Sequence, residues 1–352
     1  MGQTARRAFV ATAVAVGVVA IALALWKLKV VIALVFLGFI FAAAMRPGVD
    51  RLAAWRIPRP AGVLIHYTAL AGAIALLLWI AVPRAVDQVS EALGSVPTSR
   101  QELSQQAKHS TGIKHTILVG VQKRLRKLPS ASDVFHGAVA VGVKAFEVLI
   151  GVLFVFATAA YWIFERERAM RLVLSLVPSK HRRVVRDTWL LIDLKLGAFV
   201  RGQLLLIAFV ATVLSLSFWA IGLHFWLLIG VSAGIVEMVP VIGPLAAGAL
   251  AIGVGLTQSW HIALAAGIAV LVVRLFEDYV VIPRVMGHVT GISPLLVLVG
   301  VTAIGLLFGG AYVLLATPVL AVLVTLVDVI VRDKDPAKED VPALLFAKER
   351  QG

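Results

Sequence analysis

An apolar segment with a carboxylate and two prolines in its middle constrains the fold of this chain more than any other feature. The segment covers residues 223–256, and Glu237, Pro240 and Pro244 interrupt it. A carboxylate at the centre of a bilayer costs about 3 kcal/mol on insertion scales, so it is rarely found there without a partner or a task. Proline has no backbone N–H, so we expect unpaired carbonyls at Val236 and Pro240. Irregular backbone at membrane depth is tolerated only inside protein or beside a cavity, which predicts such a feature next to Glu237.

The composition indicates a membrane protein. Of the 352 residues, 60% are hydrophobic and only 15% are charged, which excludes a soluble domain of this length. The chain has no cysteine, so disulfides and thiolate metal sites are excluded, and we predict neither a metal site nor a cofactor. The net charge of +14 comes from basic residues that flank apolar runs, as the positive-inside bias would place them. This arrangement favours membrane anchoring and argues against a nucleic-acid partner.

The apolar runs and the polar stretches between them predict an all-α polytopic membrane protein in four regions. Residues 1–82 are expected to hold three transmembrane segments, and residues 83–145 a mostly helical, amphipathic insertion outside the cytoplasm. Residues 146–331 form the core transport region, with an amphipathic cytoplasmic segment at 165–200, and residues 332–352 form a cytoplasmic tail. Both chain ends are therefore predicted to be cytoplasmic.

The amphipathic segment has two interpretations. Its apolar stripe and basic residues suit a helix lying on the inner leaflet, where anionic lipid would favour it. The alternative is a site for a soluble partner. The fifth span is expected to run from Gly202 to Ile221.

Three charges lie close together in a later apolar run. Arg274 precedes Glu277 by three residues and Asp278 by four, so all three can meet on one face of a helix. We expect Arg274 or Arg284 to hold the two acids in their charged form. An internal salt bridge and a role in binding a coupling ion are both consistent with this spacing.

The last apolar run, residues 295–331, is too long for one ordinary span and forms a second broken element. It contains the helix-breaking residues Gly305, Gly309, Gly310 and Pro318. Two interrupted hydrophobic segments in succession point to a transport site. The Gly230/Gly234 and Gly305/Gly309 pairs have the spacing that allows close packing of helices, which is the commoner use of that motif.

Arg201 and Gln203 place a cation and an amide at the mouth of the fifth span. Arg201 is either a bidentate partner for a carboxylate or a cation that reaches lipid phosphate.

Four motifs together resemble a known family. They are Phe199-Val200-Arg201-Gly202-Gln203, Pro240-Val241-Ile242-Gly243-Pro244, Glu277-Asp278 followed by Ile282-Pro283, and Gly287 through Gly291 to Pro294-Leu295. With this spacing the chain resembles the AI-2E transporters, also called autoinducer-2 exporter-like or PerM-type permeases. The resemblance implies a bacterial inner-membrane protein with about eight hydrophobic segments, assigned to export of a signalling furanone or to sodium/proton exchange. The chain departs from the family at two places. Val241 stands where the family commonly has an aromatic residue, and a further glycine near Tyr312 is missing. These departures concern the identity of the substrate more than the fold.

We therefore predict a secondary transporter that exports a small polar solute, exchanges it for ions, or exchanges Na⁺ or Li⁺ for protons. The predicted pathway residues are Glu237, Pro240, Gly243, Pro244, Arg201, Gln203, Glu277 and Asp278, supported by Arg274, Pro283, Arg284, Gly287 and Pro294. The chain has no Walker A motif, so we expect neither ATP hydrolysis nor another enzymatic activity. The expected partners are the solute, a monovalent cation or proton and the lipid bilayer, and assembly with further copies of the chain stays open. The alternative of another class is a non-transporting membrane scaffold.

Glu237 carries the most specific hypothesis. We expect it to face a water-accessible cavity, to gain proton affinity from its apolar surroundings, and to alternate between a protonated form and one bound to a cation or the solute. The alternative is a carboxylate at the membrane interface, hydrated by water.

Overall fold

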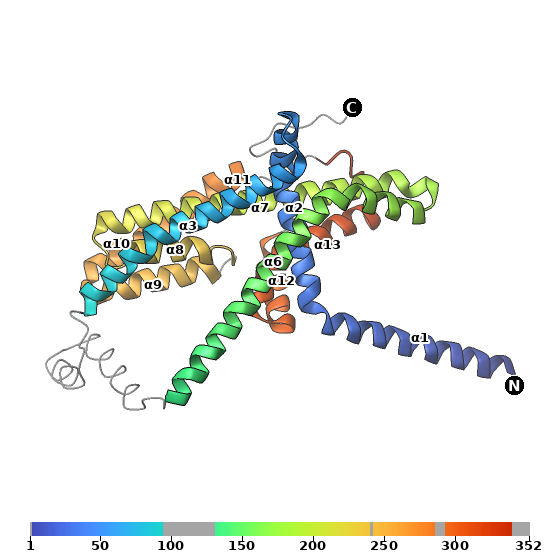
Figure 1. Cartoon of the computed structure of the whole chain (residues 1–352), viewed down its shortest axis with the longest axis horizontal. Helices are drawn as coiled ribbons and strands as arrows, with labels where there is room; N and C mark the ends of the chain where they lie inside the picture. The colour runs from blue at the N-terminus through green and yellow to red at the C-terminus, as the bar shows by residue number, and fades with distance from the viewer. Residues whose placement is uncertain (1, 94–130, 240–241, 286–292, 340–352) are drawn as a thin grey trace.

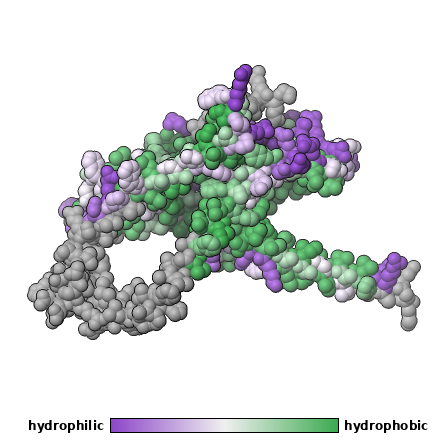
Figure 2. Space-filling view, in the orientation of Figure 1, coloured by the Kyte–Doolittle hydropathy of each residue, from purple (hydrophilic) through white to green (hydrophobic). Residues whose placement is uncertain are grey.

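The structure, a computed structural model, describes residues 2–93, 131–239, 242–285 and 293–339. Within these ranges every regular element is a helix, and six helices are long and apolar enough to cross a membrane. Many of their large apolar side chains are exposed, and Figure 2 shows them as a continuous hydrophobic surface over the crossing helices. Such a surface needs hydrocarbon or another apolar partner against it. The predicted all-α polytopic membrane protein is confirmed.

The helices follow one another with short connections between most of them. The N-terminal half contains α1 (Gly2–Lys27), α2 (Lys29–Ala54), α3 (Arg59–Leu93), α6 (Ala131–Leu176), the short η1 (Ser179–His181) and α7 (Arg182–Ile221). The C-terminal half contains α8 (Trp226–Val236), α9 (Ile242–Gln258), α10 (Trp260–Phe276), η2 (Glu277–Val281), α11 (Ile282–Val285), α12 (Pro294–Phe308), η3 (Gly310–Leu315) and α13 (Ala316–Ile330).

The long helix α7 connects the two parts of the molecule. It contacts α8 and α10 along one part of its length, and α2 and α13 along another. Figure 1 shows α3, α8, α9 and α10 gathered on one side, while α2, α6, α12 and α13 cross on the other. The helix α1 projects away from both groups, and its apolar run has no buried residue.

The largest buried cluster lies where α7, α8, α9 and α10 meet. It consists of Val210, Leu214, Phe218, Leu223, Ile229, Ala233, Ala247, Ala251, Ala266 and Val273. The small residues on α9 and α10 let these helices approach closely, while the larger residues of α7 fill the space between them. This cluster holds the ends of α8 and α10 in fixed positions.

Two helices extend beyond the apolar runs that predicted them. The helix α3 continues to Leu93 with Pro83 inside it, and α6 begins at Ala131, so both ends of the predicted insertion are helical extensions. A proline removes one helical hydrogen bond, but the turns on both sides keep theirs. Residues 94–130 lie outside the described part of the chain, so most of the insertion stays a prediction.

The predicted amphipathic segment and the fifth span predicted from Gly202 share one helix. One helix, α7, runs without interruption from Arg182 to Ile221. Gly202 is buried within it. A single interior glycine costs only about 1 kcal/mol relative to alanine, which packing easily offsets. The amphipathic half and the apolar half of α7 are therefore one mechanical unit.

Both predicted broken elements are present. The first consists of α8 and α9 with a break after Val236, and α8 has only 11 residues. At 1.5 Å per residue α8 is roughly 16 Å long, about half the thickness of a hydrocarbon core. The second break separates α12 from η3 and α13 at Gly309, whose φ of 104° is open to glycine but disfavoured for other residues.

The two glycine pairs singled out in the sequence, Gly230/Gly234 and Gly305/Gly309, differ in how closely they let helices pack. An added Cβ at Gly230 would lie 2.6 Å from the backbone nitrogen of Ser215, and one at Gly234 would lie 2.7 Å from the carbonyl oxygen of Ile207. This pair therefore lets α8 pack backbone to backbone against α7, as predicted. At Gly309 an added Cβ meets nothing within 4 Å, and at Gly305 it would lie 3.2 Å from a side-chain methyl group of Val313, so the second pair does not bring two helix backbones together.

We expect Gly230→Ala to lower the free energy of unfolding by about 1–3 kcal/mol, because its methyl group overlaps the backbone of α7. Gly253→Ala is the matched control: it also lies in an apolar helix, but an added Cβ has open space. The control should be neutral or stabilise the protein by up to about 1 kcal/mol. Tryptophan-fluorescence thermal unfolding in detergent measures both. Equal midpoints for the two variants would show that the α7–α8 contact is not tight.

Candidate functional site

Glu237 lies at the break between α8 and α9. It is the first residue after α8, and only 8% of its side chain is exposed. An added Cβ at Gly243, in the first turn of α9, would lie 2.3 Å from the carbonyl oxygen of Val236. Glycine at position 243 thus allows the two helix ends to meet directly beside Glu237.

The carbonyl of Val236 is not free, contrary to the prediction. It accepts a hydrogen bond from the backbone N–H of Val239 at 2.9 Å. The chain tightens into an i to i+3 turn after α8, and this turn uses the acceptor that Pro240 cannot satisfy. Pro240 itself lies outside the described residues. Pro244 falls in the first turn of α9, where a missing N–H costs little.

Arg274 is the centre of the site. Its guanidinium group lies 2.8 Å from a carboxylate oxygen of Glu237, 3.2 Å from one of Glu277 and 3.0 Å from one of Asp278. Arg274 is thus the cation that holds Glu277 and Asp278, as one of the two predicted alternatives stated. Arg284 is exposed, and no carboxylate in the described ranges pairs with it. The contact of Glu237 with Arg274 was not predicted, because the two residues are 37 positions apart along the chain.

The helix that carries these charges changes its geometry at the cluster. Residues Glu277–Val281 form a π-helical turn, η2, directly after α10. A π turn rotates the following side chains relative to a regular α-helix, and such turns occur frequently at functional sites. Here the side chain of Glu277 is buried at 2% exposure, whereas that of Asp278 is 39% exposed. The cluster therefore reaches from the interior to the surface of the bundle.

The cluster is short of positive charge. One guanidinium group faces three carboxylates, so the formal charge is −2 when all four groups are ionised. A buried carboxylate is costly unless it is paired and hydrogen-bonded. One arginine cannot neutralise three acids, and the cluster therefore has capacity for a proton or an added cation.

Gln203 and Arg201 lie two residues apart on α7, so they point in different directions and make different contacts. The side-chain amide of Gln203 donates to the backbone carbonyl of Glu237 at 3.4 Å, which brings Gln203 to the site. Arg201 donates to the carbonyl of Ala44 on α2 at 3.2 Å, and its buried Nε has no hydrogen-bond partner within the described part of the chain. No carboxylate of the described residues forms an ion pair with Arg201. Arg201 thus lies between α7 and α2, apart from the Arg274 cluster.

Two of the remaining predicted residues can be placed on their helices. Pro283 is in α11, the short helix that follows the π turn, and Pro294 is the first residue of α12. Ser293 caps that helix by accepting a hydrogen bond from the N–H of Leu296. Gly287 lies outside the described residues. Among the described residues no group of three or more His, Asp or Glu side chains is arranged to hold a metal ion.

One feature of the sequence could have predicted the whole cluster. Glu237, Arg274, Glu277 and Asp278 are the only formally charged residues between Arg201 and Arg284. Because a buried charge needs a partner, the isolated Glu237 could be assigned to the one arginine available to it.

Comparisons with known proteins agree with the resemblance in the sequence. A family model described as "AI-2E family transporter" matches residues 15–332. "Putative transport protein YrrI" of Bacillus subtilis (strain 168) is 24% identical over 276 residues, which cover 76% of this chain and 77% of that protein. "Putative transport protein YueF" of the same organism is 27% identical over 289 residues, 78% of each chain.

We expect Arg274→Gln to lower the free energy of unfolding by about 3–5 kcal/mol, because it leaves buried carboxylates without a cation. Changing Glu237 and Glu277 to glutamine in the same protein should restore part of this loss. Arg284→Gln removes an exposed arginine from the same region and should stay within about 0.5 kcal/mol of the parent protein. Thermal unfolding in detergent gives all three values. If Arg274→Gln unfolds at the same temperature as Arg284→Gln, the Arg274 cluster does not stabilise the fold.

Proposed function

The chain belongs to the AI-2E family of transporters, and from this premise we propose that it is a secondary transporter that works through the Arg274 cluster. The chain is a multi-pass membrane protein of a transporter family, and a secondary transporter moves its solute across the membrane that it spans. The observation that carries the proposal is the buried contact between Glu237, at the break of one helix pair, and Arg274, beside the π turn of the next helix.

The helix break and the π turn support this location. A packed apolar bundle gains nothing from a buried charge in a broken helix, because apolar residues of similar volume would stabilise it as well or better. In transporters, broken helices gather at the binding site because their irregular backbone and polar side chains can face a solute there. Two of the motifs by which the chain resembles the AI-2E family, residues 240–244 and residues 277–278, lie at this break and at this π turn, which strengthens the assignment.

The charge of the cluster suggests how it would work. Each carboxylate has about four lone-pair sites on its two oxygens, so contact with Arg274 leaves acceptor capacity on all three. A proton, a monovalent cation or a hydroxyl-bearing solute can use this capacity. A proton or a cation changes the charge around Arg274, and a hydroxyl-bearing solute competes for the same carboxylate lone pairs, so each of them weakens the hold of Arg274 on at least one acid. Because Glu237 and Glu277 belong to different helices, this change would let α8 and α10 move relative to each other.

Two substrates fit this chemistry. Export of a small polar solute, such as an autoinducer-2-like molecule, would use the carboxylates as acceptors for its hydroxyl groups. Exchange of Na⁺ or Li⁺ for protons would use them as oxygen ligands that a proton can also occupy. The excess of negative charge favours a cation in the cycle in both cases, as substrate or as coupling ion. A scaffold without transport activity would not need this excess.

We further propose the inner membrane of a bacterium as the location, with both chain ends in the cytoplasm. The basic residues support this orientation, because the end of the molecule formed by the α6–α7 hairpin and the α2–α3 loop is rich in arginine, and Figure 2 shows it as its most hydrophilic part.

We expect Glu237→Gln to abolish coupled flux and to leave folding intact, because Arg274 keeps Glu277 and Asp278 as partners. The assay uses proteoliposomes with an entrapped pH-sensitive dye, challenged with gradients of Na⁺, Li⁺ and a panel of small polar solutes. Glu165→Gln is the control, since it neutralises an exposed acid on α6. Flux of normal size and normal pH dependence in Glu237→Gln would rule out the mechanism. Absence of flux in the parent protein for every gradient would favour the scaffold.

A separate prediction concerns Arg201. Lysine keeps the positive charge but loses the planar fork of donors, so Arg201→Lys should lose the bond to Ala44 and lower the flux at least twofold if the α2–α7 contact is part of the pathway. The same proteoliposome assay measures it. Unchanged flux would assign Arg201 to a role outside the pathway, such as contact with lipid phosphate.

A further inference from the structure

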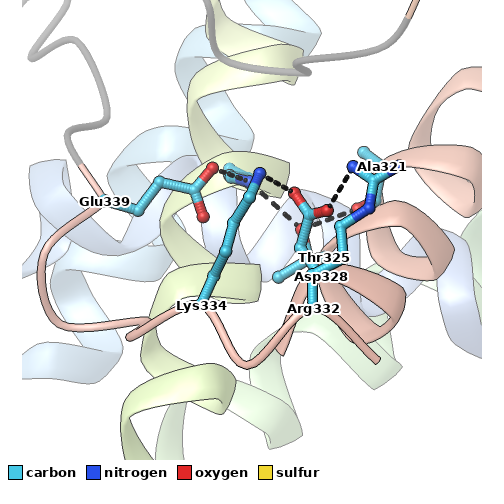
Figure 3. A network of polar contacts seen from close by, with 7 residues as sticks. Ala321, Thr325, Asp328, Arg332, Lys334 and Glu339 are labelled. Carbon is cyan, nitrogen blue, oxygen red and sulfur yellow. Dashed lines mark hydrogen bonds and ion pairs between the residues drawn. The ribbon is translucent and has the colours of Figure 1, made fainter. Parts of the chain in front are cut away.

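The residues that follow α13 fold back onto its end. The backbone N–H groups of Arg332 and Lys334 donate to the carbonyls of Val327 and Asp328, and Pro336 is buried. Asp333 turns the chain with a φ of 48°, a conformation that costs energy for a residue other than glycine. The side chains of Arg332 and Lys334 both reach the buried carboxylate of Asp328, at 2.9 Å and 2.7 Å, and Figure 3 shows them directed toward it. Residues 332–339 are therefore held in place against α13.

This segment supplies the counter-ion for a buried lysine on another helix. The ammonium group of Lys195, on α7, is only 5% exposed and lies 2.7 Å from a carboxylate oxygen of Glu339. Its other partner is the hydroxyl of Thr325 on α13, at 3.2 Å. The hydroxyl of Thr325 donates its hydrogen to the carbonyl of Ala321, so a lone pair on the hydroxyl oxygen is directed toward Lys195. Three elements, α7, α13 and the C-terminal segment, thus meet at one ammonium group.

Glu339 is the only carboxylate that neutralises Lys195 within the described part of the chain. A hydroxyl group accepts a hydrogen bond but carries no charge, so Thr325 alone cannot compensate a buried ammonium group. When Glu339 moves away, Lys195 must draw water into the contact between α7 and α13 or leave that contact. Glu339 itself is 32% exposed, so water can hydrate it once it is released.

The position of Lys195 on α7 connects this contact to the Arg274 cluster. Gln203, which donates to the backbone carbonyl of Glu237, follows Lys195 by eight residues on the same uninterrupted helix. Eight residues correspond to about 12 Å along a helix axis. A displacement of α7 at Lys195 is therefore transmitted to the backbone of Glu237 by a rigid element.

We propose that residues 332–339 are a C-terminal latch: Glu339 on Lys195 holds the N-terminal half of α7 against the C-terminal half of α13, and its release lets the two helices separate as a step of the transport cycle. The latch deepens the proposed function and rests on it for its role in transport. Its structural part, the restraint on α7 and α13, stands on the contacts of Lys195 alone.

The test compares the distance between α7 and α13 with and without the latch. The chain contains no cysteine, so Leu194→Cys and Ile330→Cys, both at exposed positions, introduce a unique pair of spin labels on the two helices. The full-length labelled protein is placed in lipid nanodiscs, and pulsed electron paramagnetic resonance gives the distance distribution. Lys195→Met/Glu339→Gln removes both charges of the latch, so that no unpaired buried ion remains. We expect the population at longer distances to rise at least twofold.

Glu165→Gln/Arg168→Gln is the matched control, because it removes an exposed ion pair within α6 with the same change in charges. It should leave the distances unchanged. If the double latch variant does not fold, Glu339→Asp takes its place, since it keeps the charge but shortens the side chain and should shift the same population more weakly. Identical distance distributions in the latch variant and the control overturn the proposal.

Flux separates the latch from the proposed function. In the proteoliposome assay with a Na⁺ gradient and an entrapped pH-sensitive dye, the latch variant should show an initial rate at least twofold above that of the control. A rate equal to the control's, together with longer distances, rejects the role of the latch in transport. No flux in either protein contradicts the proposed function for Na⁺ and protons, whereas the distances still decide whether Glu339 restrains α7 and α13.

Discussion

One guanidinium group shared among three carboxylates is the interaction on which the centre of this structure depends. Arg274 ties the break after α8 to the π turn after α10, next to the largest apolar cluster, where the side chains of Glu237 and Glu277 are buried. Without this cation the buried acids at positions 237 and 277 would have to be hydrated or protonated. With Arg274 in place, three carboxylates still face one cation. This excess of negative charge gives the cluster the capacity to take up a further cation.

The charges of the molecule form separate groups that α7 connects. Near its start, Asp193 is paired with Arg166 of α6 and lies 3.7 Å from Arg46 of α2. Lys195 follows two residues later with its contacts to α13 and the C-terminal latch. Beyond these, the same helix contributes Gln203 to the site and apolar residues to the main core. Because a continuous helix transmits displacement along its axis, changes at one group reach the others through α7. This arrangement explains why a helix of 40 residues, far longer than one membrane crossing, is useful to the molecule.

The helix boundaries show where local sequence signals were insufficient. Pro83 and Gly202 are both breakers by residue type, yet α3 and α7 continue through them. The Glu237 region, with similar residue types, does break. Two prolines, Pro240 and Pro244, stand there on either side of Gly243, whose missing side chain lets the two helix ends meet, whereas Pro83 and Gly202 are single breakers. Whether a single breaker interrupts a helix depends on how that helix packs against the others, which no window of local sequence contains.

By itself, the sequence determined the class of the protein and the chemistry available to it. Long apolar runs must form helices in a membrane because every backbone polar group needs an internal partner there. The scarcity of charges within these runs marked Glu237, Arg274, Glu277 and Asp278 as residues with a task. The salt bridge from Arg274 to Glu277 and Asp278 also followed from their spacing on one helix. Only the tertiary structure decided that Glu237 joins them and that Glu339 reaches Lys195, because these pairs are separated by 37 and 144 residues. Contacts across such distances are set by the packing of whole helices, and the local periodicity of the sequence does not predict them.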